Sequence, residues 1–289
     1  MVRRRARAPY NDPVTGSRGR RRKALGQHRL VDHRVLRRIV RAAEFGDEDT
    51  VIEVGAGSGL LTELLAQRAS RLIAVEVDTE LTAGLRERFR GRDNVSVVEA
   101  DVLSISPDEV LTRGGGRMPY VVVGNLPYFI GSAILRHFLT ARARPRWLLV
   151  TLQAEVARNI AAGPGKMSYL SVEMQYYAQP RLLFEIPAAA FRPPPKVRSA
   201  VVRLDTRQDA AVEVHDREAF FRLVQAGFAA PRKQLRNALS IGLGCGTAEA
   251  ESMLGAAGVE PTRRAQTLTL EEWARLYGAY RSTTVGAAI

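Results

Sequence analysis

The sequence predicts an α/β fold, an open and mainly parallel sheet with helices on both faces, followed by a small all-helical C-terminal domain. Three observations predict it. From Asp49 onward, short apolar runs alternate with stretches of helical periodicity, and strands separated by helices form parallel βαβ units. Two later runs are separated only by the Pro-rich turn Arg192–Lys196, which indicates an antiparallel hairpin at a sheet edge. Beyond Asp205 only helical periodicity remains.

The individual elements follow from these periodicities. The predicted strands are short and rich in β-branched residues, at Thr50–Val54, Arg71–Val77, Val95–Val98, Tyr120–Val123, Trp147–Thr151, Tyr176–Ile186 and Val197–Leu204. The predicted helices have apolar residues three or four positions apart, at Leu60–Ala69, Leu81–Phe89, Ile134–Leu139, Val156–Ala161, Arg217–Phe228, Arg232–Leu239, Ala248–Leu254 and Leu270–Tyr280. We therefore expect a sheet domain at residues 24–207 and a helical domain at residues 208–289.

Composition excludes several classes of protein. With 289 residues, 46% of them apolar, the chain can bury a full core, and no uncharged run of about 18 apolar residues is present to span a membrane. The single cysteine, Cys245, excludes a disulfide framework and fits a reducing compartment. The four histidines lack metal-ligand spacing, so we expect no metal. We expect a cytoplasmic monomer with no membrane partner.

The formal charge of +13 is concentrated at the N-terminus. Residues 1–23 contain nine Arg and Lys but only one acid, Asp12, and they lack apolar periodicity, so we expect a disordered basic arm. Such an arm can bind nucleic-acid phosphates, and we single out Arg20, Arg21, Arg22 and Lys23 for that role. A solubilising tail or a transit peptide are the alternatives.

Two motifs predict a nucleoside site. Glu53-Val54-Gly55-Ala56-Gly57-Ser58-Gly59 follows the first strand, and a glycine-rich turn there lets a ligand approach the backbone closely. Glu76 ends the second strand, where a carboxylate can accept both hydroxyls of a ribose. A tight turn with only a packing role is the alternative, and NAD(P) is a rival ligand.

Acceptors also follow the next two strands. Asp101 comes just past the third strand and can accept a hydrogen bond from an adenine amino group, which favours an adenosine-containing cofactor. Asn125-Leu126-Pro127-Tyr128 follows the fourth strand. The Asn125 side-chain oxygen and a backbone carbonyl near Pro127 can accept the two hydrogens of an exocyclic base amine, which makes its nitrogen a better nucleophile. Tyr128 can stack on the extruded base. Methyl transfer to a base amine needs these groups and hydride transfer does not.

Together these segments resemble the S-adenosylmethionine-dependent rRNA adenine N6-dimethyltransferases. The resemblance extends from Leu25 to about Tyr280 and includes Leu25-Gly26-Gln27-His28-Arg29-Leu30 and Phe191-Arg192-Pro193-Pro194-Pro195-Lys196-Val197. It implies a Rossmann-like methyltransferase sheet and S-adenosylmethionine as cofactor. Asn and Phe are usual in the family where this chain has His28 and Arg29.

The resemblance also implies roles for single residues. His28 and Leu30 flank the cofactor, Gly55 faces its methionine portion, and Asn125 lies between the cofactor and the target nitrogen. Phe191 is a second candidate for stacking on the flipped adenine; a core position is its alternative.

The family has two branches that share this chemistry, a small-subunit (16S) branch and an Erm-type 23S branch that confers macrolide resistance. Leu126, the segment Ala162–Lys166 and the segment Pro231–Asn237 resemble the 16S branch, and the arginine-rich arm resembles the other. In the last segment we expect Arg232, Lys233 and Arg236 to lie on one helix face and contact RNA phosphates. Rival functions are a non-catalytic rRNA-binding assembly factor and, more distantly, an oxidoreductase.

Overall fold

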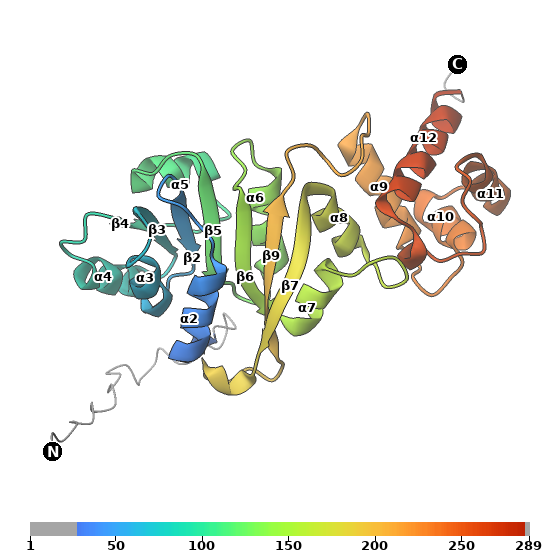
Figure 1. Ribbon diagram of the computed structural model, residues 1–289. Helices are drawn as coiled ribbons and strands as arrows, with labels where there is room; N and C mark the ends of the chain where they lie inside the picture. Colours follow the sequence, from blue (N-terminus) through green and yellow to red (C-terminus); the bar gives the residue numbers. More distant parts are fainter. Residues whose placement is uncertain (1–27, 287–289) are drawn as a thin grey trace.

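A central sheet of seven strands organises the protein (Figure 1), seen in a computed structural model that describes residues 28–286. The strand order is β4-β3-β2-β5-β6-β9-β7. The first five run parallel, and β9 and β7 form an antiparallel pair at the edge, as the sequence predicted. The strands are β2 (Thr50–Val54), β3 (Arg71–Glu76), β4 (Val95–Glu99), β5 (Tyr120–Asn125), β6 (Trp147–Gln153), β7 (Ala178–Ile186) and β9 (Ser199–Thr206).

Helices cover both faces of this sheet because alternate strand residues point to opposite sides. Val51 and Val121 pack against one group of helices, whereas Ile52 and Val122 pack into the larger cluster on the other face. The first face carries α2 (His33–Ala42), α3 (Leu60–Leu65) and α4 (Thr79–Arg88). The second face carries α5 (Pro107–Gly114), α6 (Gly131–Thr140), α7 (Ala154–Ile160) and α8 (Tyr169–Tyr177). No helix within residues 28–286 is long and apolar enough to cross a membrane.

A second, two-stranded sheet joins distant parts of the chain. The strand β1 (Arg29–Leu30) pairs antiparallel with β8 (Phe191–Arg192), which follows the 3-10 helix η1 (Ala188–Ala190). The amides of Val31 and Asp32 both donate to the Ala190 carbonyl, at 2.9 and 3.2 Å. This sheet was not predicted from the sequence, because two-residue strands carry no periodicity.

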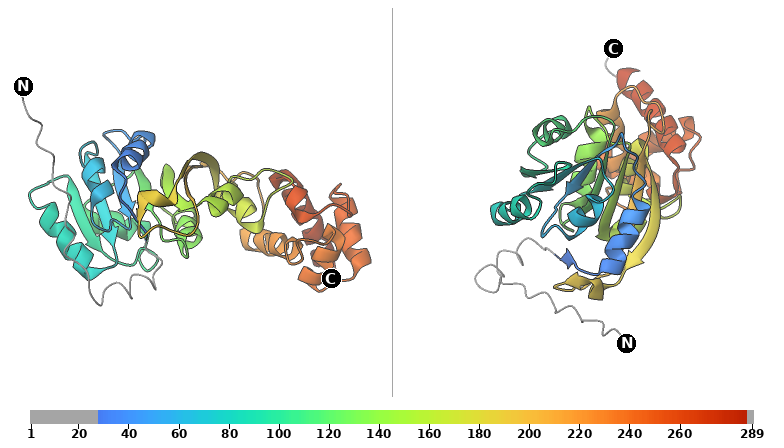
Figure 2. Two further views of the ribbon diagram at one scale, coloured as in Figure 1. Left: turned by 90° about the horizontal axis from the view of Figure 1, so that it is seen from below. Right: turned by 60° about the vertical axis from the view of Figure 1, so that its left-hand side comes forward.

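The C-terminal helices α9 (Arg217–Gly227), α10 (Leu235–Leu243), α11 (Thr247–Ala256) and α12 (Leu270–Gly286), with the 3-10 helix η2 (Ala265–Thr267), lie beyond the β7 end of the sheet (Figure 2). Aromatic rings connect them to the sheet. Tyr176 of α8 lies 5.6 Å from Phe220 and 5.2 Å from Phe221 of α9, and Phe220 lies 5.9 Å from Tyr277 of α12. One continuous apolar cluster therefore extends from the sheet into these helices.

Two predicted elements were wrong in detail. Tyr176 and Tyr177 end helix α8 and do not begin a strand, because Ser168 and Ser171 form a capping box that starts a helix there. The helix expected from Arg232 begins only at Leu235. Helices α2, α5 and α8 were not predicted.

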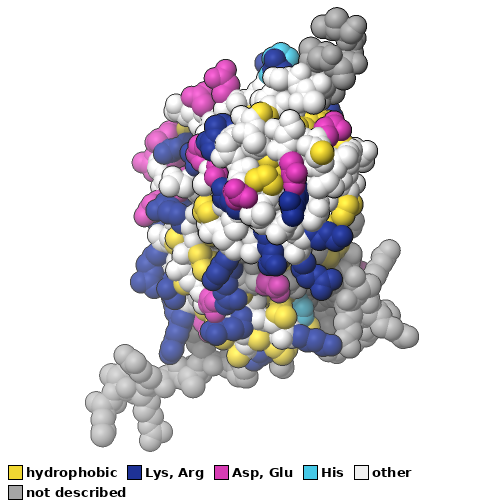
Figure 3. All heavy atoms as spheres, turned by 90° about the vertical axis from the view of Figure 1, so that its right-hand side faces the viewer, with side chains coloured by type: hydrophobic (Ala, Val, Ile, Leu, Met, Phe, Trp, Pro, Cys, Tyr) yellow, Lys and Arg dark blue, Asp and Glu magenta, His cyan; other side chains and the backbone are white. Residues whose placement is uncertain are grey.

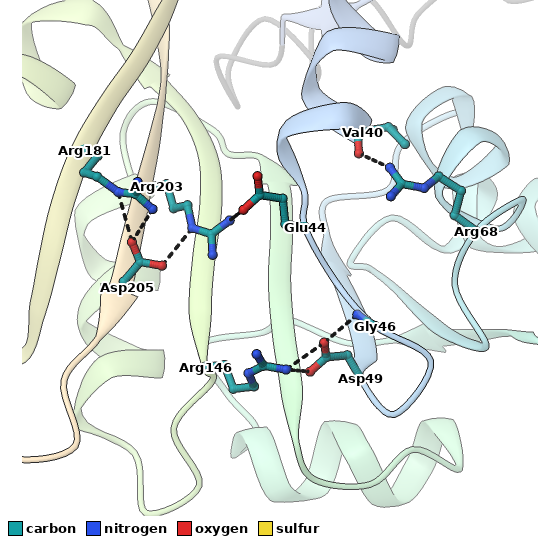
Figure 4. A network of polar contacts seen from close by, with 9 residues as sticks. All are labelled: Val40, Glu44, Gly46, Asp49, Arg68, Arg146, Arg181, Arg203 and Asp205. Atoms are coloured by element: carbon teal, nitrogen blue, oxygen red, sulfur yellow. Dashed lines mark hydrogen bonds and ion pairs between the residues drawn. The ribbon is translucent and has the colours of Figure 1, made fainter.

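Polar contacts fix the edge of the sheet at which the parallel strands begin (Figure 4). The buried Asp49 carboxylate accepts from the Gly46 amide at 2.9 Å and from Arg146 Nη1 at 3.0 Å. Arg203 donates to Asp205 at 2.8 Å and to Glu44 at 3.3 Å. These contacts leave the opposite edge, where the parallel strands end, available for ligands.

Candidate functional site

A cavity of about 680 Å³ lies at the carboxyl ends of the parallel strands. Segments from β2, β3, β5 and the β1–β8 sheet contribute to its wall. Eight residues predicted from the sequence line it: His28, Leu30, Gly55, Glu76, Asp101, Asn125, Pro127 and Tyr128. The strand-end motifs thus converge on one site, as expected for an α/β sheet.

Glycines shape the floor of this cavity. Gly55 has φ of +74°, and a Cβ atom there would meet only the Asn125 carbonyl, at 3.8 Å, so a side chain would project into free space that a ligand can use. Gly59 has φ of +81°, and its Cβ would lie 2.9 Å from Leu85 Cδ2, so its role is packing against α4. One glycine of the motif therefore opens the site and another supports it.

Glu76 is held rigidly at the end of β3. Its Oε2 accepts from the Gly57 amide at 2.8 Å, and its Oε1 accepts from the amides of Val77 and Asp78 at 2.9 and 3.1 Å. Oε1 already accepts two hydrogen bonds, whereas Oε2 accepts one and keeps a second acceptor site for a ligand hydroxyl. Val77, which the sequence analysis did not single out, lines the same wall and is 55% exposed, so it offers an apolar surface to a base.

Asp101 lies just past β4 and also lines the cavity. Its Oδ1 accepts from the Leu103 amide at 3.0 Å, which closes a local turn. No hydrogen bond within residues 28–286 uses its Oδ2, which remains available to an amino group.

Asn125, in the wall of the cavity, has an unsatisfied hydrogen-bond acceptor in its side-chain amide. Its Nδ2 donates to the His28 carbonyl at 3.0 Å, and because a carbonyl can only accept, this contact fixes the orientation of the amide. The Oδ1 atom is buried and has no hydrogen-bond partner within the described residues. A buried orphan acceptor costs about 1–3 kcal/mol, so this position is suited to a donor from a ligand.

Tyr128 is positioned by two neighbours. Its hydroxyl and the Ser199 hydroxyl lie 2.5 Å apart, and burial raises the Tyr128 pKa while this hydrogen bond partly opposes the rise. The His28 ring lies 5.5 Å from the Tyr128 ring at an interplanar angle of 32°. His28 Nδ1 also donates to the Pro193 carbonyl at 2.8 Å. The histidine that departs from the family pattern therefore ties β1 to the Pro-rich turn.

The Pro127 carbonyl is partly engaged, because it accepts from the Ile130 amide at 3.2 Å. A carbonyl has a second lone pair, so this group can still accept one hydrogen from a ligand.

Glu53 is a residue that the sequence analysis quoted without assigning a role. It is 1% exposed, it contributes to the cavity wall, and its Oε2 has no hydrogen-bond partner among residues 28–286. Desolvation raises its pKa from 4.5 to about 8, with a smaller contribution from the Glu76 charge, while nearby Thr62 counteracts part of the rise. In the sequence, the only sign that Glu53 contributes to the site was its place as the penultimate residue of a buried strand.

The prediction that Phe191 stacks on the target base was wrong, because the structure buries its ring away from the cavity. Its ring is fully buried within the apolar cluster beneath α2 and is not part of the cavity wall. Apolar side chains of α2 and of the central sheet belong to the same cluster and enclose the ring, so no ring face is open to a base.

The predicted RNA contacts are only partly brought together. Arg232 and Lys233 are exposed, but they lie on the turn before α10 and not on one helix face with Arg236. Arg236 instead forms an ion pair with Glu251 at 2.6 Å. Lys and Arg side chains gather on the lower part of the face that carries the C-terminal helices (Figure 3). The predicted contacts Arg20, Arg21, Arg22 and Lys23 lie outside the described residues.

Comparisons with known proteins agree with this site. The family model described as "Ribosomal RNA adenine dimethylase" matches residues 18–280. A protein named "Ribosomal RNA small subunit methyltransferase A" from Dehalococcoides mccartyi is 46% identical over 88% of this chain and 87% of its own length. One of the same name from Moorella thermoacetica is 45% identical over 88% of this chain and 91% of its own.

Solved structures show the same fold. The 23S rRNA methyltransferase ErmE matches with a TM-score of 0.68 and 30% identity, over 86% of this chain and 98% of its own. A dimethyladenosine transferase from Plasmodium falciparum matches with a TM-score of 0.74 and 20% identity, over 89% of this chain and 98% of its own. The extent of the family match and the convergence of the strand-end motifs lead to one conclusion: this chain belongs to the ribosomal RNA adenine dimethylase family.

Proposed function

We propose that this protein dimethylates N6 of adenine in small-subunit rRNA and uses S-adenosylmethionine as cofactor. The observation that carries the proposal is the buried, unpartnered Oδ1 of Asn125 in the cavity wall beside Tyr128. The two relatives described above that are named as small-subunit enzymes are 45–46% identical to this chain, against 30% for the 23S enzyme ErmE.

The cavity fits the cofactor. Gly55 leaves space that a Cβ would fill. Glu76 Oε2 offers an acceptor for a ribose hydroxyl, Asp101 an acceptor for the adenine amino group, and His28 and Leu30 flank the same space. When bound, S-adenosylmethionine supplies a methyl group activated by its sulfonium charge.

The residues of the chain then prepare the nucleophile. The target adenine leaves its stack and lies against Tyr128, and stacking of about 1–3 kcal/mol offsets part of the cost of extrusion. Asn125 Oδ1 accepts one N6 hydrogen and the Pro127 carbonyl accepts the other, which localises the lone pair on nitrogen for attack on the methyl carbon. The proton leaves afterwards from the cationic amine to water, so no general base is required. After the first transfer one N6 hydrogen remains, and Asn125 can still hold it for the second.

Residues 24–207 would carry this chemistry and residues 208–289 would contact RNA. All the groups proposed for the cofactor come from one chain, so a monomer suffices, and we propose that it acts in the cytoplasm.

The substrate is tested with labelled cofactor and two RNAs, immature small-subunit particles and protein-free 23S rRNA. We expect dimethyladenine in the particles. Label in the 23S rRNA alone would instead establish the 23S alternative.

The role of Asn125 is tested by Asn125→Ala. We expect methyl transfer to be lost while S-adenosylmethionine still binds in calorimetry, because the acceptor for the target amine is removed and Glu76 and Asp101 are kept. Turnover at the wild-type rate would refute the assigned role.

A further inference from the structure

Helix α2 presents four arginines on one face. Arg34, Arg37, Arg38 and Arg41 are all exposed, and their spacing of three, four and seven residues aligns them along the helix. We call them the arginine stripe. The opposite face of α2, with Leu36, Ile39 and Val40, is buried against the sheet. The stripe is about 10 Å long, from the rise of 1.5 Å per residue.

The charge of this stripe is not compensated locally. Within residues 28–286, none of the four guanidinium groups forms an ion pair, whereas exposed arginines of other helices, such as Arg86 and Arg113, pair with Glu99 and Glu109. Of the acids that flank the stripe in the sequence, Asp32 caps the helix with its carboxylate, and Glu44 pairs with Arg203 at 3.3 Å. Arg34 lies in the first turn, where the helix dipole disfavours a positive charge. The helix therefore holds a row of cations that only an external anion would neutralise.

The stripe borders a groove with an apolar floor. Arg38, Arg41 and Ala42 form one side, and Leu183 and Phe184 of the edge strand β7 form the other. The Arg38 guanidinium lies 3.8 Å above the Phe184 ring centroid. Cations beside an aromatic surface are the combination that binds single-stranded nucleic acid, because phosphates meet the cations and bases meet the apolar surface.

The stripe also begins at the wall of the cavity. The residues before α2 donate two hydrogen bonds to the Ala190 carbonyl of η1, and the chain continues from there to Arg192 and Pro193, which line the cavity. In Figure 1, α2 and the segment around η1 accordingly lie together at the bottom of the molecule. A nucleic-acid strand that lies along the stripe would therefore lead towards Tyr128.

We propose that the arginine stripe and its groove bind the backbone of the substrate RNA on one side of the target adenine, as a second RNA-contacting surface apart from the C-terminal helices. This inference rests on the proposed function for the identity of the polyanion. The arginine-rich residues 1–23 would be repelled by the stripe and are not its occupant.

The test is the triple variant Arg37→Gln/Arg38→Gln/Arg41→Gln. Its control is Arg86→Gln/Arg90→Gln/Arg113→Gln, which removes the same charge from exposed, ion-paired positions on α4, on the turn after it and on α5. RNA affinity is measured against salt concentration, with calorimetric binding of S-adenosylmethionine and the melting temperature to verify the fold.

The slope of log K against log salt is negative, and we expect its magnitude to decrease by about 2–3 units in the stripe variant, since each phosphate contact contributes about 0.7–0.9. At 0.1 M salt, affinity should fall by roughly 100-fold. The control should change the slope by less than one unit. Arg37→Lys/Arg38→Lys/Arg41→Lys should restore the slope, because lysine also binds phosphate as a point charge.

An unchanged slope, or an equal loss in the control, would overturn the inference. The inference would also be overturned if the stripe variant bound RNA normally but no longer bound vesicles of anionic lipid, because that result would assign the stripe to a membrane surface. These slopes are measured without turnover, so a failure of methylation in small-subunit particles would refute the proposed function and leave the stripe independently tested.

Discussion

Replacing Glu53 by Gln should remove most of the pH dependence of stability between pH 5 and pH 8. The carboxyl is fully buried and its pKa is about 8 in the folded protein, against 4.5 for the free side chain. In this window the folded state binds a proton that the unfolded state has released, so the free energy of unfolding falls as pH rises. At 1.36 kcal/mol per pKa unit, the loss from pH 5 to pH 8 is about 3.5 kcal/mol.

The assay is urea unfolding at pH 5, 6, 7 and 8 for wild type and Glu53→Gln. Glutamine has nearly the same shape and does not ionise, so the variant should gain about 3–4 kcal/mol relative to wild type across this range. Glu109→Gln, which removes a half-exposed partner of Arg113, is the control and should change little. A difference between Glu53→Gln and wild type that stays constant with pH would show that this carboxyl titrates near its ordinary pKa.

Two further predictions concern packing around the site and in the C-terminal helices. Ser199→Ala removes the hydrogen-bond partner of Tyr128, so we expect kcat to fall several-fold and stability by about 1 kcal/mol, with cofactor affinity unchanged in calorimetry; restored kcat in Ser199→Thr would separate a hydroxyl effect from a packing effect, and unaltered kcat in Ser199→Ala would contradict the role. In Gly242→Ala the new Cβ would lie 2.4 Å from Ala226 Cα, so the α9–α10 contact must separate at a cost of about 1–3 kcal/mol in thermal unfolding. Gly278→Ala on α12 meets nothing within 4 Å and should be neutral or slightly stabilising; equal melting temperatures for the two variants would refute this account of the contact.

The parallel strands and the converging motifs could be predicted because each depends on local sequence. A buried parallel strand such as Tyr120–Asn125 is a continuous apolar run, and its polar end must reach the ligand edge of the sheet. The edge hairpin of β7 and β9 was predicted because a Pro-rich turn, and no helix, separates its two strand-like runs.

What could not be predicted depends on contacts between distant residues. The β1–β8 pair joins residues more than 160 positions apart in the chain, as the hydrogen bond from His28 to Pro193 illustrates. Phe191 has an aromatic ring that could stack on a base, and only its packing in the cluster beneath α2 shows that it belongs to the core. The raised pKa of Glu53 likewise arises from burial, which sequence alone does not reveal.

The aromatic rings that connect α8, α9 and α12 have a consequence for cooperativity. Tyr176 and Phe220 belong to the same apolar cluster as the sheet residues, so neither half of the chain closes its own core without the other. Loosening of the C-terminal helices would expose ring faces beside the sheet and destabilise it as well. A lesion far from the cofactor, at the outer helices, would therefore lower the amount of folded enzyme and leave the chemistry of each folded molecule intact.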